Sequence, residues 1–382
     1  MVPQQTSKPR LATVITGHCS HVQPQWAASD VCPTGLQQTN SADHAFGRWR
    51  AYHLFYHSDH DRMLRLLVRP LLIDLFRMDL IRRFFFVRYT VGGPHLRLRW
   101  QLADDSPRAE AMFIDASAKF FSRNPSLSSW SEDAIHRENQ RMLRSDPFTG
   151  PQHDVAYSDN SWARFPLHFE FDRYGGEALL GYSLDMFCLS SVHVLSLLTR
   201  HDAISVSWKR LAMFRLTLDL AWGLAENEEN FVDLASYAVR WMGEQYSDSC
   251  RHGTIAFENR AAQLVDVVRG DVESKVLPER AGVIDDLSRP ASWLAQQTAD
   301  LLYETRRYLA ESHIHMTINR LGLNNAEEVY LSCILRRSIE AFRTSMPELW
   351  RKIWELRSDF VTRARAYSLE QVVTSALERL AL

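Results

Sequence analysis

The sequence predicts an α+β fold, with small antiparallel sheets and a largely helical C-terminal half in a single large domain. Strand-like alternation of apolar and polar side chains flanks a Gly92-Gly93-Pro94 break and recurs before Gly175-Gly176. From about residue 203 the apolar residues instead recur every three or four positions, as in helices that bury one face. We therefore expect one domain over residues 48–345, in which helices cap the sheet, and a helical extension over residues 346–382.

Composition and charge exclude several classes of protein. The formal net charge is −2 and the pI is about 6.7, so we expect neither nucleic acid nor a membrane as a partner of this chain. No run approaches the length of a membrane-spanning helix and the N-terminus has no apolar signal segment, which predicts a cytoplasmic location. The cysteines lack metal-binding spacing, and we expect free, mostly buried thiols at Cys19, Cys32, Cys188, Cys250 and Cys333.

The N-terminal part of the chain predicts a flexible segment followed by a strand and a helix. Residues 1–47 are rich in Gln, Ser, Thr and Pro without periodicity, which indicates flexibility. Order is expected to begin near Trp49, where AYHLFYH alternates like a strand, and Asp59 and Asp61 can then cap a helix. The stripe of that helix that faces a core consists of Leu64, Leu67, Val68, Leu71, Leu72 and Leu75.

The stretch from Phe84 to Leu102 predicts a β-hairpin whose second strand alternates strictly. Its apolar residues belong on the face towards a core, and Arg97 and Arg99 lie on the other face, about 7 Å apart. Two guanidinium forks at that spacing suit an anion with two acidic ends, although a solvated outer sheet face would show the same pattern. The polar face carries His95, Arg97, Arg99 and Gln101.

Helices and one further strand are predicted after the hairpin. Pro107 opens a helix to about Phe121, and a loop over 124–150 contains at most a short helix near 132–143. FPLHFEFDRY at 165–174 alternates like a strand, which places Arg173 at a corner before a helix over 177–199. There Arg173 can point into a cleft or form a surface ion pair with Glu170 or Asp172. Further helices are expected at 203–224, 229–246, 255–269, 290–311, 313–321, 326–343, 346–363 and 368–381.

Other chemistries find little support. The sequence has no GxGxxG, GxxxxGK[ST], HExxH or GxSxG motif, and the pair His313 and His315 lacks a third ligand at helical spacing, so we expect no metal and no cofactor. A single histidine such as His315 is more often a satisfied core or surface residue than a catalyst. However, histidine is the side chain whose usual pKa lies closest to neutral pH, so we consider His315 a candidate for proton transfer. Asn319 lies four residues later on the same helical face and is expected to help fix the imidazole.

Three motifs occur in an order that resembles a known family. They are GPHLRLR at Gly93–Arg99, RYGG at Arg173–Gly176 and HMxxNR at His315–Arg320. Over about residues 48–345 the chain resembles the C-terminal elimination domain of class I lanthipeptide dehydratases, which is also described as the thiopeptide-type bacteriocin biosynthesis family.

The resemblance implies a reaction and a set of residues. In that family glutamate, transferred from glutamyl-tRNA to Ser or Thr of a precursor peptide, is eliminated to leave dehydroalanine or dehydrobutyrine. Arg97 and Arg99 would bind glutamate, Arg173 would stabilise a carboxylate or the enolate, and His315 would transfer the proton. His95, Tyr174 and Asn319 would contribute to substrate binding.

Full-length dehydratases carry a large glutamylation domain before this one, so the resemblance implies a stand-alone elimination protein. Its partners would be a ribosomally made precursor peptide and a separate glutamyl-tRNA-dependent glutamylation protein, and a homodimer is left open. One alternative is a thiopeptide pyridine synthase, which joins two dehydroalanines by a formal [4+2] cycloaddition and releases the leader peptide. Another is a non-catalytic scaffold that binds the precursor peptide.

Overall fold

The computed structural model describes residues 48–128, 130–145, 155–167, 171–174, 176–199, 204–276 and 287–364, together with Val373, Ala376 and Leu377. The chain divides after residue 41, and all described residues belong to the second part. The predicted flexible segment over 1–47, and the helix predicted at 368–381 apart from the three named residues, lie outside the described residues.

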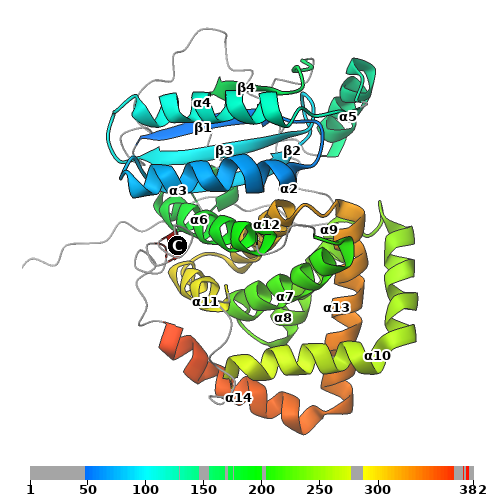
Figure 1. The fold of residues 1–382 in the computed structure, drawn as a ribbon. Coiled ribbons are helices and arrows are strands. Elements are labelled where there is room, and N and C mark those ends of the chain that lie inside the picture. The colour runs from blue at the N-terminus through cyan, green and yellow to red at the C-terminus, as the bar shows by residue number, and fades with distance from the viewer. Residues whose placement is uncertain are drawn as a thin grey trace, which may run out of the picture. The chain divides into compact units, whose positions relative to one another are not determined.

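A four-stranded antiparallel sheet forms the β part of the fold (Figure 1). Its strands are β1 (Trp49–Phe55), β2 (Ile81–Tyr89), β3 (His95–Leu102) and β4 (Ser161–Phe165), in the order β2-β3-β1-β4. The predicted α+β class is therefore confirmed, with a single sheet among the described residues. Because β3 pairs with β1 on one side and β2 on the other, the row of Arg97 and Arg99 lies inside the sheet.

One face of this sheet is covered by the helices that precede and follow the hairpin (Figure 1). Leu96, Leu98 and Trp100 of β3 are fully buried, and Trp100 meets Phe113 edge to face at 5.5 Å. The predicted stripe from Leu64 to Leu75 joins the same core. The covering elements are α2 (His60–Met63), which Asp59 caps, the π-helical segment η1 (Leu64–Val68), α3 (Arg69–Arg77) and α4 (Arg108–Arg123).

The other face of the sheet packs against α6 (Glu177–Thr199) and α12 (Tyr303–Leu321). In α6, the segment Leu179–Thr199 is long and apolar enough to span a membrane, contrary to the expectation that no run would be. Because 78% of its apolar window is buried inside the protein, it forms part of the protein core. Its side chains Leu180, Leu184 and Phe187 cluster with Phe85 and Val87 of β2.

The C-terminal half is helical, as predicted, and α12 and α13 form a tight hairpin within it. Gly322 ends α12 in the left-handed conformation (φ +83°), and Asn324 and Glu327 form a capping box that starts α13. The remaining helices are α5 (Glu132–Ser145), α7 (Val206–Leu224), α8 (Glu228–Ala235), α9 (Tyr237–Met242), α10 (Ser247–Val276), α11 (Ser288–Gln297), α13 (Asn325–Ser345) and α14 (Pro347–Ala364).

Several predicted elements have different boundaries in the structure. The helix expected over 229–246 is divided into α8 and α9, and the helix expected over 255–269 extends over 247–276 as α10. The strand expected over 165–174 is wrong: β4 ends at Phe165, and Phe171–Tyr174 forms a 3-10 turn, η2. Pro166 follows β4 directly and cannot donate a sheet hydrogen bond, which explains the end of the strand. The break expected at residue 312 instead lies between α11 and α12, at 298–302.

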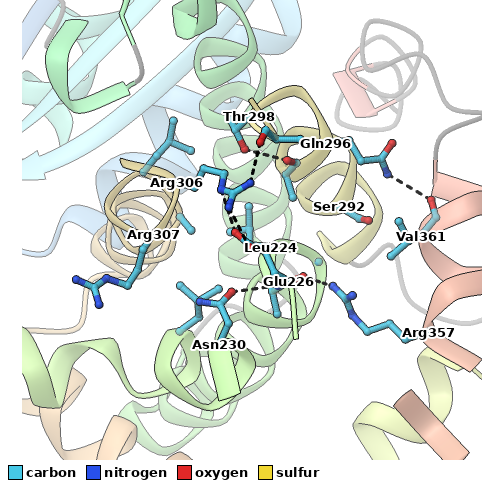
Figure 2. Close-up of a pocket in the computed structure, with 17 residues that line it drawn as sticks. Leu224, Glu226, Asn230, Ser292, Gln296, Thr298, Arg306, Arg307, Arg357 and Val361 are labelled. Atoms are coloured by element: carbon cyan, nitrogen blue, oxygen red, sulfur yellow. Dashed lines mark hydrogen bonds and ion pairs between the residues drawn. The ribbon is translucent and has the colours of Figure 1, made fainter. Parts of the chain in front are cut away.

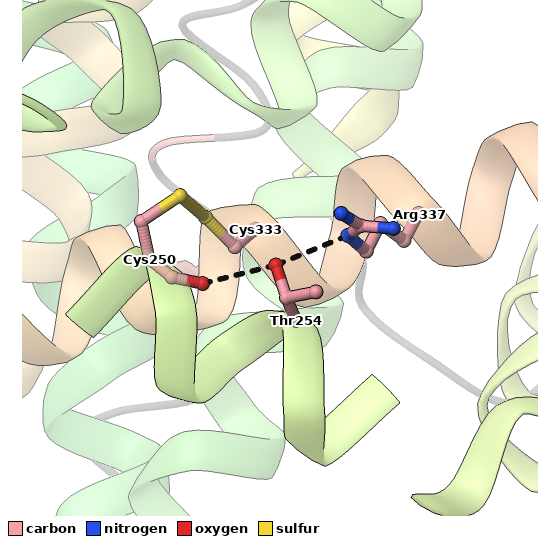
Figure 3. Close-up of a disulfide and its surroundings, with 4 residues drawn as sticks. All are labelled: Cys250, Thr254, Cys333 and Arg337. Atoms are coloured by element: carbon pink, nitrogen blue, oxygen red, sulfur yellow. Dashed lines mark hydrogen bonds between the residues drawn. A yellow bond between two sulfur atoms is a disulfide. The ribbon is translucent and has the colours of Figure 1, made fainter. Parts of the chain in front are cut away.

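A disulfide joins Cys250 of α10 to Cys333 of α13, so the prediction of free thiols is wrong at these positions (Figure 3). Their Cα atoms are 5.7 Å apart. The helices approach closely here because Gly253 has no side chain: a Cβ at that position would lie 2.5 Å from the Tyr330 carbonyl oxygen. Cys188 is a buried free thiol, as expected.

Candidate active site

Arg97 and Arg99 lie half-buried on the face of β3 predicted from strand parity. The Arg97 guanidinium stacks 3.5 Å from the centre of the Tyr89 ring, and that of Arg99 lies 5.2 Å from the Phe85 ring. Both aromatic residues come from β2, the neighbouring strand in the sheet. The flat cations are therefore held against aromatic rings, which orients their hydrogen-bonding edges.

His95 connects the glycine turn to Arg97. Its Nδ1 donates to the Gly93 carbonyl oxygen at 2.8 Å, which leaves Nε2 to accept from Arg97 Nε at 3.2 Å. Burial, reinforced by the charge of Arg97, holds the pKa of His95 well below its usual value, so the ring is neutral. His95 thus positions Arg97, and its own ring is 1% exposed.

The two glycines of the turn are required by their conformation and by the space around them. Gly92 and Gly93 have φ values of +86° and +111°. A Cβ on Gly93 would lie 2.5 Å from His57 Nε2, and one on Gly92 would lie 2.8 Å from the Tyr157 ring. The motif GPHLRLR therefore combines a turn that only glycine fits with the cations it positions.

Arg173 and Tyr174 in the turn η2 contact α12. Arg173 Nε donates to the buried Ser312 hydroxyl at 3.3 Å, so this arginine points inward from the corner. Tyr174 is 5% exposed and meets the rings of Phe187 at 4.8 Å and His313 at 5.6 Å. The turn is thereby anchored between α6 and α12, the two helices that cover this face of the sheet.

His315 on α12 faces a carboxyl group that the sequence analysis did not identify. Its Nδ1 lies 3.1 Å from both carboxyl oxygens of Glu328 on α13. The Trp241 ring of α9 lies 6.0 Å from the imidazole, and Trp241 Nε1 donates to Glu311 at 2.6 Å. The side chain of His315 is 21% exposed, whereas that of Glu328 is 2% exposed. The pair thus has one buried end and one accessible end.

Burial controls the protonation of this pair. It raises the pKa of Glu328 well above the usual value, and burial together with the charge of Arg173 lowers the pKa of His315 to about 3. The 3.1 Å contact is therefore best described as a neutral imidazole beside a protonated carboxyl, although its geometry would equally fit an ion pair. These two forms hold the same number of protons, and they interconvert when one proton moves across the hydrogen bond.

Asn319 does not orient His315, contrary to the expectation from its spacing. Its side-chain oxygen accepts from the Arg88 backbone N–H at 2.9 Å, and its amide donates to the Arg88 carbonyl at 3.0 Å. Arg88 lies on β2, which is an edge strand of the sheet among the described residues. Asn319 therefore joins α12 to the sheet, and Glu328 is the residue that holds the imidazole.

A fourth arginine, Arg320, contributes to the electrostatics of this site. It is fully buried and donates to the Ser191 hydroxyl at 2.9 Å and the Met316 carbonyl at 2.7 Å. Burial lowers the pKa of Arg320 to about 9. The charge of Arg99 also lowers this pKa, whereas Tyr174 raises it. Arg320 is thus electrostatically coupled to residues of both β3 and η2.

The segments that carry Arg97, Arg99, Arg173 and His315 meet at one aromatic cluster. Tyr174 and Met316, which neighbour Arg173 and His315 in the chain, pack with Phe85 and Val87. Phe85 and Val87 are in turn the strand partners of Arg99 and Arg97. The cavity described below lies elsewhere, among the C-terminal helices, and none of the predicted residues lines it. The site is thus a face of charged side chains on a packed aromatic base.

Glu328 could have been found from the helix hairpin. His315 precedes Gly322 by seven residues and Glu328 follows it by six, so the two lie at the same height on antiparallel helices. The signals were Gly322, which ends one helix, and the Asn324-x-x-Glu327 capping box, which begins the next.

The fold and this site define an α+β protein with a cationic, histidine-containing face between an antiparallel sheet and covering helices. The chain belongs to the family described as lantibiotic biosynthesis dehydratase C-term, whose model matches residues 49–339. Membership of this family places it among the enzymes that modify ribosomally made peptides. Comparison with curated proteins gives no match.

Solved structures share the fold at low sequence identity. The pyridine synthase TbtD from thiomuracin biosynthesis matches with a TM-score of 0.61 and 17% identity, over 77% of this chain and 98% of TbtD. The tRNA-dependent lantibiotic dehydratase MibB from Microbispora sp. 107891 matches with a TM-score of 0.51 and 18% identity, over 83% of this chain but 29% of MibB. TsrL matches with a TM-score of 0.50 and 16% identity, over 80% of this chain and 98% of TsrL.

Proposed function

We propose that this protein eliminates glutamate from O-glutamylated Ser or Thr residues of a precursor peptide, leaving dehydroalanine or dehydrobutyrine. The observation that supports this most is that Arg97 and Arg99, Arg173 and His315 lie on segments that meet at one aromatic cluster. A glutamyl ester formed from glutamyl-tRNA carries a free γ-carboxylate, and its elimination releases the α-carboxyl group as a second carboxylate. A site with several fixed guanidinium groups matches that charge.

The chemistry assigns a role to each group. A base takes the α-proton of the modified residue, the Cα–Cβ double bond forms, the Cβ–O bond breaks, and glutamate leaves with the bonding electrons as a carboxylate. Arg97 and Arg99 bind the glutamyl group, because their planar forks are already held against Tyr89 and Phe85. Arg173 stabilises the negative charge of the enolate or of the leaving carboxylate.

His315 with Glu328 exchanges the proton. When the pair has lost one proton, Glu328 is a carboxylate that accepts from Nδ1–H, and Nε2 is then free to take the α-proton. When the pair holds that proton, Nε2 carries hydrogen and can donate. The same pair thus serves as base before elimination and as acid afterwards.

The pyridine synthase reaction is the second candidate, supported by the common fold with TbtD. We favour elimination because two dehydroalanine side chains are uncharged and give four cationic or titratable groups little to bind. In either case the partner of this chain is a precursor peptide. For elimination, a separate glutamylation protein supplies the glutamyl ester. We place both reactions in the cytoplasm.

Mass spectrometry of two reactions distinguishes these functions. The purified protein is incubated with an O-glutamylated precursor peptide and, separately, with an azole peptide that contains dehydroalanines. Conversion of glutamylated residues to dehydroamino acids supports elimination. Pyridine formation with leader release would establish the second function instead, and binding without any product would indicate a scaffold.

A further inference from the structure

A cavity of about 290 Å³ lies among the C-terminal helices, where the proposed reaction uses no residue (Figure 2). Segments of α7, α8, α11, α12 and α14 and the turns beside them line it. Its charged lining consists of three arginines and one glutamate. The polar residues that matter here are Glu226, Asn230, Gln296, Arg306, Arg307 and Arg357.

Most of these polar groups have partners within the protein. Arg306 pairs with Glu226 at 3.0 Å and also donates to the Ala299 carbonyl at 2.8 Å. Arg307 pairs with Glu304 and lies 3.8 Å from Glu311. The side-chain amides of Asn230 and Gln296 donate to the Tyr303 hydroxyl and the Val361 carbonyl, each at 3.3 Å. The charges of Arg306 and Arg307 are therefore compensated without a ligand.

Arg357 of α14 differs from the other two arginines. It is 8% exposed, and among the described residues no carboxylate pairs with it. Its Nη2 donates to the carbonyl oxygens of Trp222, at 3.0 Å, and Ala225, and Figure 2 shows it reaching from α14 towards the chain after α7. Its Nε is buried and has no hydrogen-bond partner among the described residues.

The surroundings of Arg357 compensate its charge only in part. The two carbonyls lie at the C-terminal end of α7, where the helix dipole amounts to about half a negative charge. The rings of Trp222 and Trp354 lie 5.5 and 5.2 Å from the guanidinium and add weaker attraction. Burial lowers the pKa of Arg357 to about 10. An anion in the cavity would offset this cost of burying the cation.

We propose that this cavity binds a small carboxylate ligand, of about the size of an amino acid, beside the guanidinium group of Arg357. One positive charge that no carboxylate of the described residues compensates matches one carboxylate ligand. A phosphate group carries about −1.5 to −2 and would require a further free cation, which the paired Arg306 and Arg307 do not supply. The volume suits a ligand rather than a single ion.

Isothermal titration calorimetry of the full chain tests this with L-glutamate, glutarate, acetate and inorganic phosphate as probes. We expect saturable binding of at least one carboxylate, weaker binding of phosphate, and a loss of about tenfold or more in carboxylate affinity in Arg357→Gln, which removes the charge. Arg351→Gln, on the exposed face of the same helix, should bind like the wild type. Ala299→Phe should weaken binding by obstructing the cavity without touching Arg357.

The proposal is overturned if no carboxylate saturates the wild type, if phosphate binds at least as tightly, or if Arg357→Gln binds undiminished. Circular dichroism and thermal melting show whether Arg357→Gln is folded. If it is not, Ala299→Phe decides: unchanged carboxylate affinity in that variant overturns the assignment to this cavity, and weakened affinity supports it. No outcome depends on peptide turnover, so the result is independent of the proposed elimination.

Discussion

The imidazole of His315 faces the buried carboxyl of Glu328, with Nδ1 3.1 Å from both carboxyl oxygens, across the hairpin of α12 and α13. Replacing Glu328 with Gln should lower the rate of glutamate release about 100-fold, the order that general acid–base catalysis contributes. Burial raises the pKa of Glu328 well above its usual value, so the wild-type rate should rise with pH as the pair loses its proton. The amide that replaces this carboxyl does not titrate and the pKa of His315 is about 3, so this rise should disappear in Glu328→Gln.

The neighbouring variant Glu327→Gln is the matched control, since Gln can also complete the capping box that starts α13. Its rate and pH profile should follow the wild type. A rate in Glu328→Gln that equals the wild type, with the same dependence on pH, would show that His315 works without this partner.

Replacing Arg97 or Arg99 should lower the activity of the enzyme even when the replacement keeps the positive charge. Lysine lacks the planar fork that stacks on Tyr89 or Phe85, so Arg97→Lys and Arg99→Lys should lower kcat/KM for the glutamylated peptide about 10- to 100-fold. Gln101→Ala changes the same face of the strand and should stay within about threefold. Full activity in both lysine variants would contradict the proposed binding of the glutamyl group.

Asn319 should matter for stability more than for chemistry. Its side chain satisfies both the N–H and the carbonyl of Arg88 on the sheet edge, so Asn319→Ala should lower the free energy of unfolding by about 1 to 3 kcal/mol. Urea denaturation measures this directly. An unchanged midpoint would mean that water replaces the amide at no cost.

The disulfide between Cys250 and Cys333 should stabilise the helical half. It links residues 83 positions apart, and removing such a link costs about 2 to 4 kcal/mol. Adding reductant should therefore lower the melting temperature of the wild type and leave that of a Cys250→Ser, Cys333→Ser double variant unchanged. Equal melting curves with and without reductant in the wild type would show that the bridge does not stabilise the folded chain.

Acidification should weaken the fold partly through His313. Burial, with added effects of Arg320 and Arg173, lowers its pKa to about 3 in the folded protein, whereas the unfolded chain takes up the proton near pH 6.5. Because the unfolded state binds the proton first, stability is lost as the pH falls from about 6.5 towards 3. When the pH is lowered from about 7 to about 5, the free energy of unfolding should fall by about 1 to 2 kcal/mol less in His313→Gln than in the wild type, as measured by urea denaturation. Identical losses would refute this.

Local pattern was enough to predict much of the fold, but not where distant segments meet. The alternation in β3 correctly assigned Leu96 to the core and Arg97 to the opposite face, because side chains in a strand alternate strictly. The same reasoning failed at 165–174, where Pro166 ends the strand and a 3-10 turn replaces it. One residue that cannot donate a hydrogen bond outweighed the alternating pattern.

Partners across long separations were harder to predict. The spacing of Asn319 and His315 suggested a contact, but Asn319 bonds to Arg88, 231 residues away. The pairing of Cys250 with Cys333 depends on the close approach of two helices at Gly253, which spacing alone does not indicate. Glu328 was within reach of sequence reasoning, because the helix ends on both sides of Gly322 are encoded locally.

The most direct test of the proposed reaction is the amount of free glutamate released from an O-glutamylated precursor peptide, measured against the dehydroamino acids formed. The wild type should release one glutamate for each dehydroamino acid, and His315→Ala should release none above the uncatalysed rate while still binding the peptide. Release by His315→Ala at the wild-type rate, or no release by the wild type from a peptide that it binds, would contradict the assignment of this site to glutamate elimination.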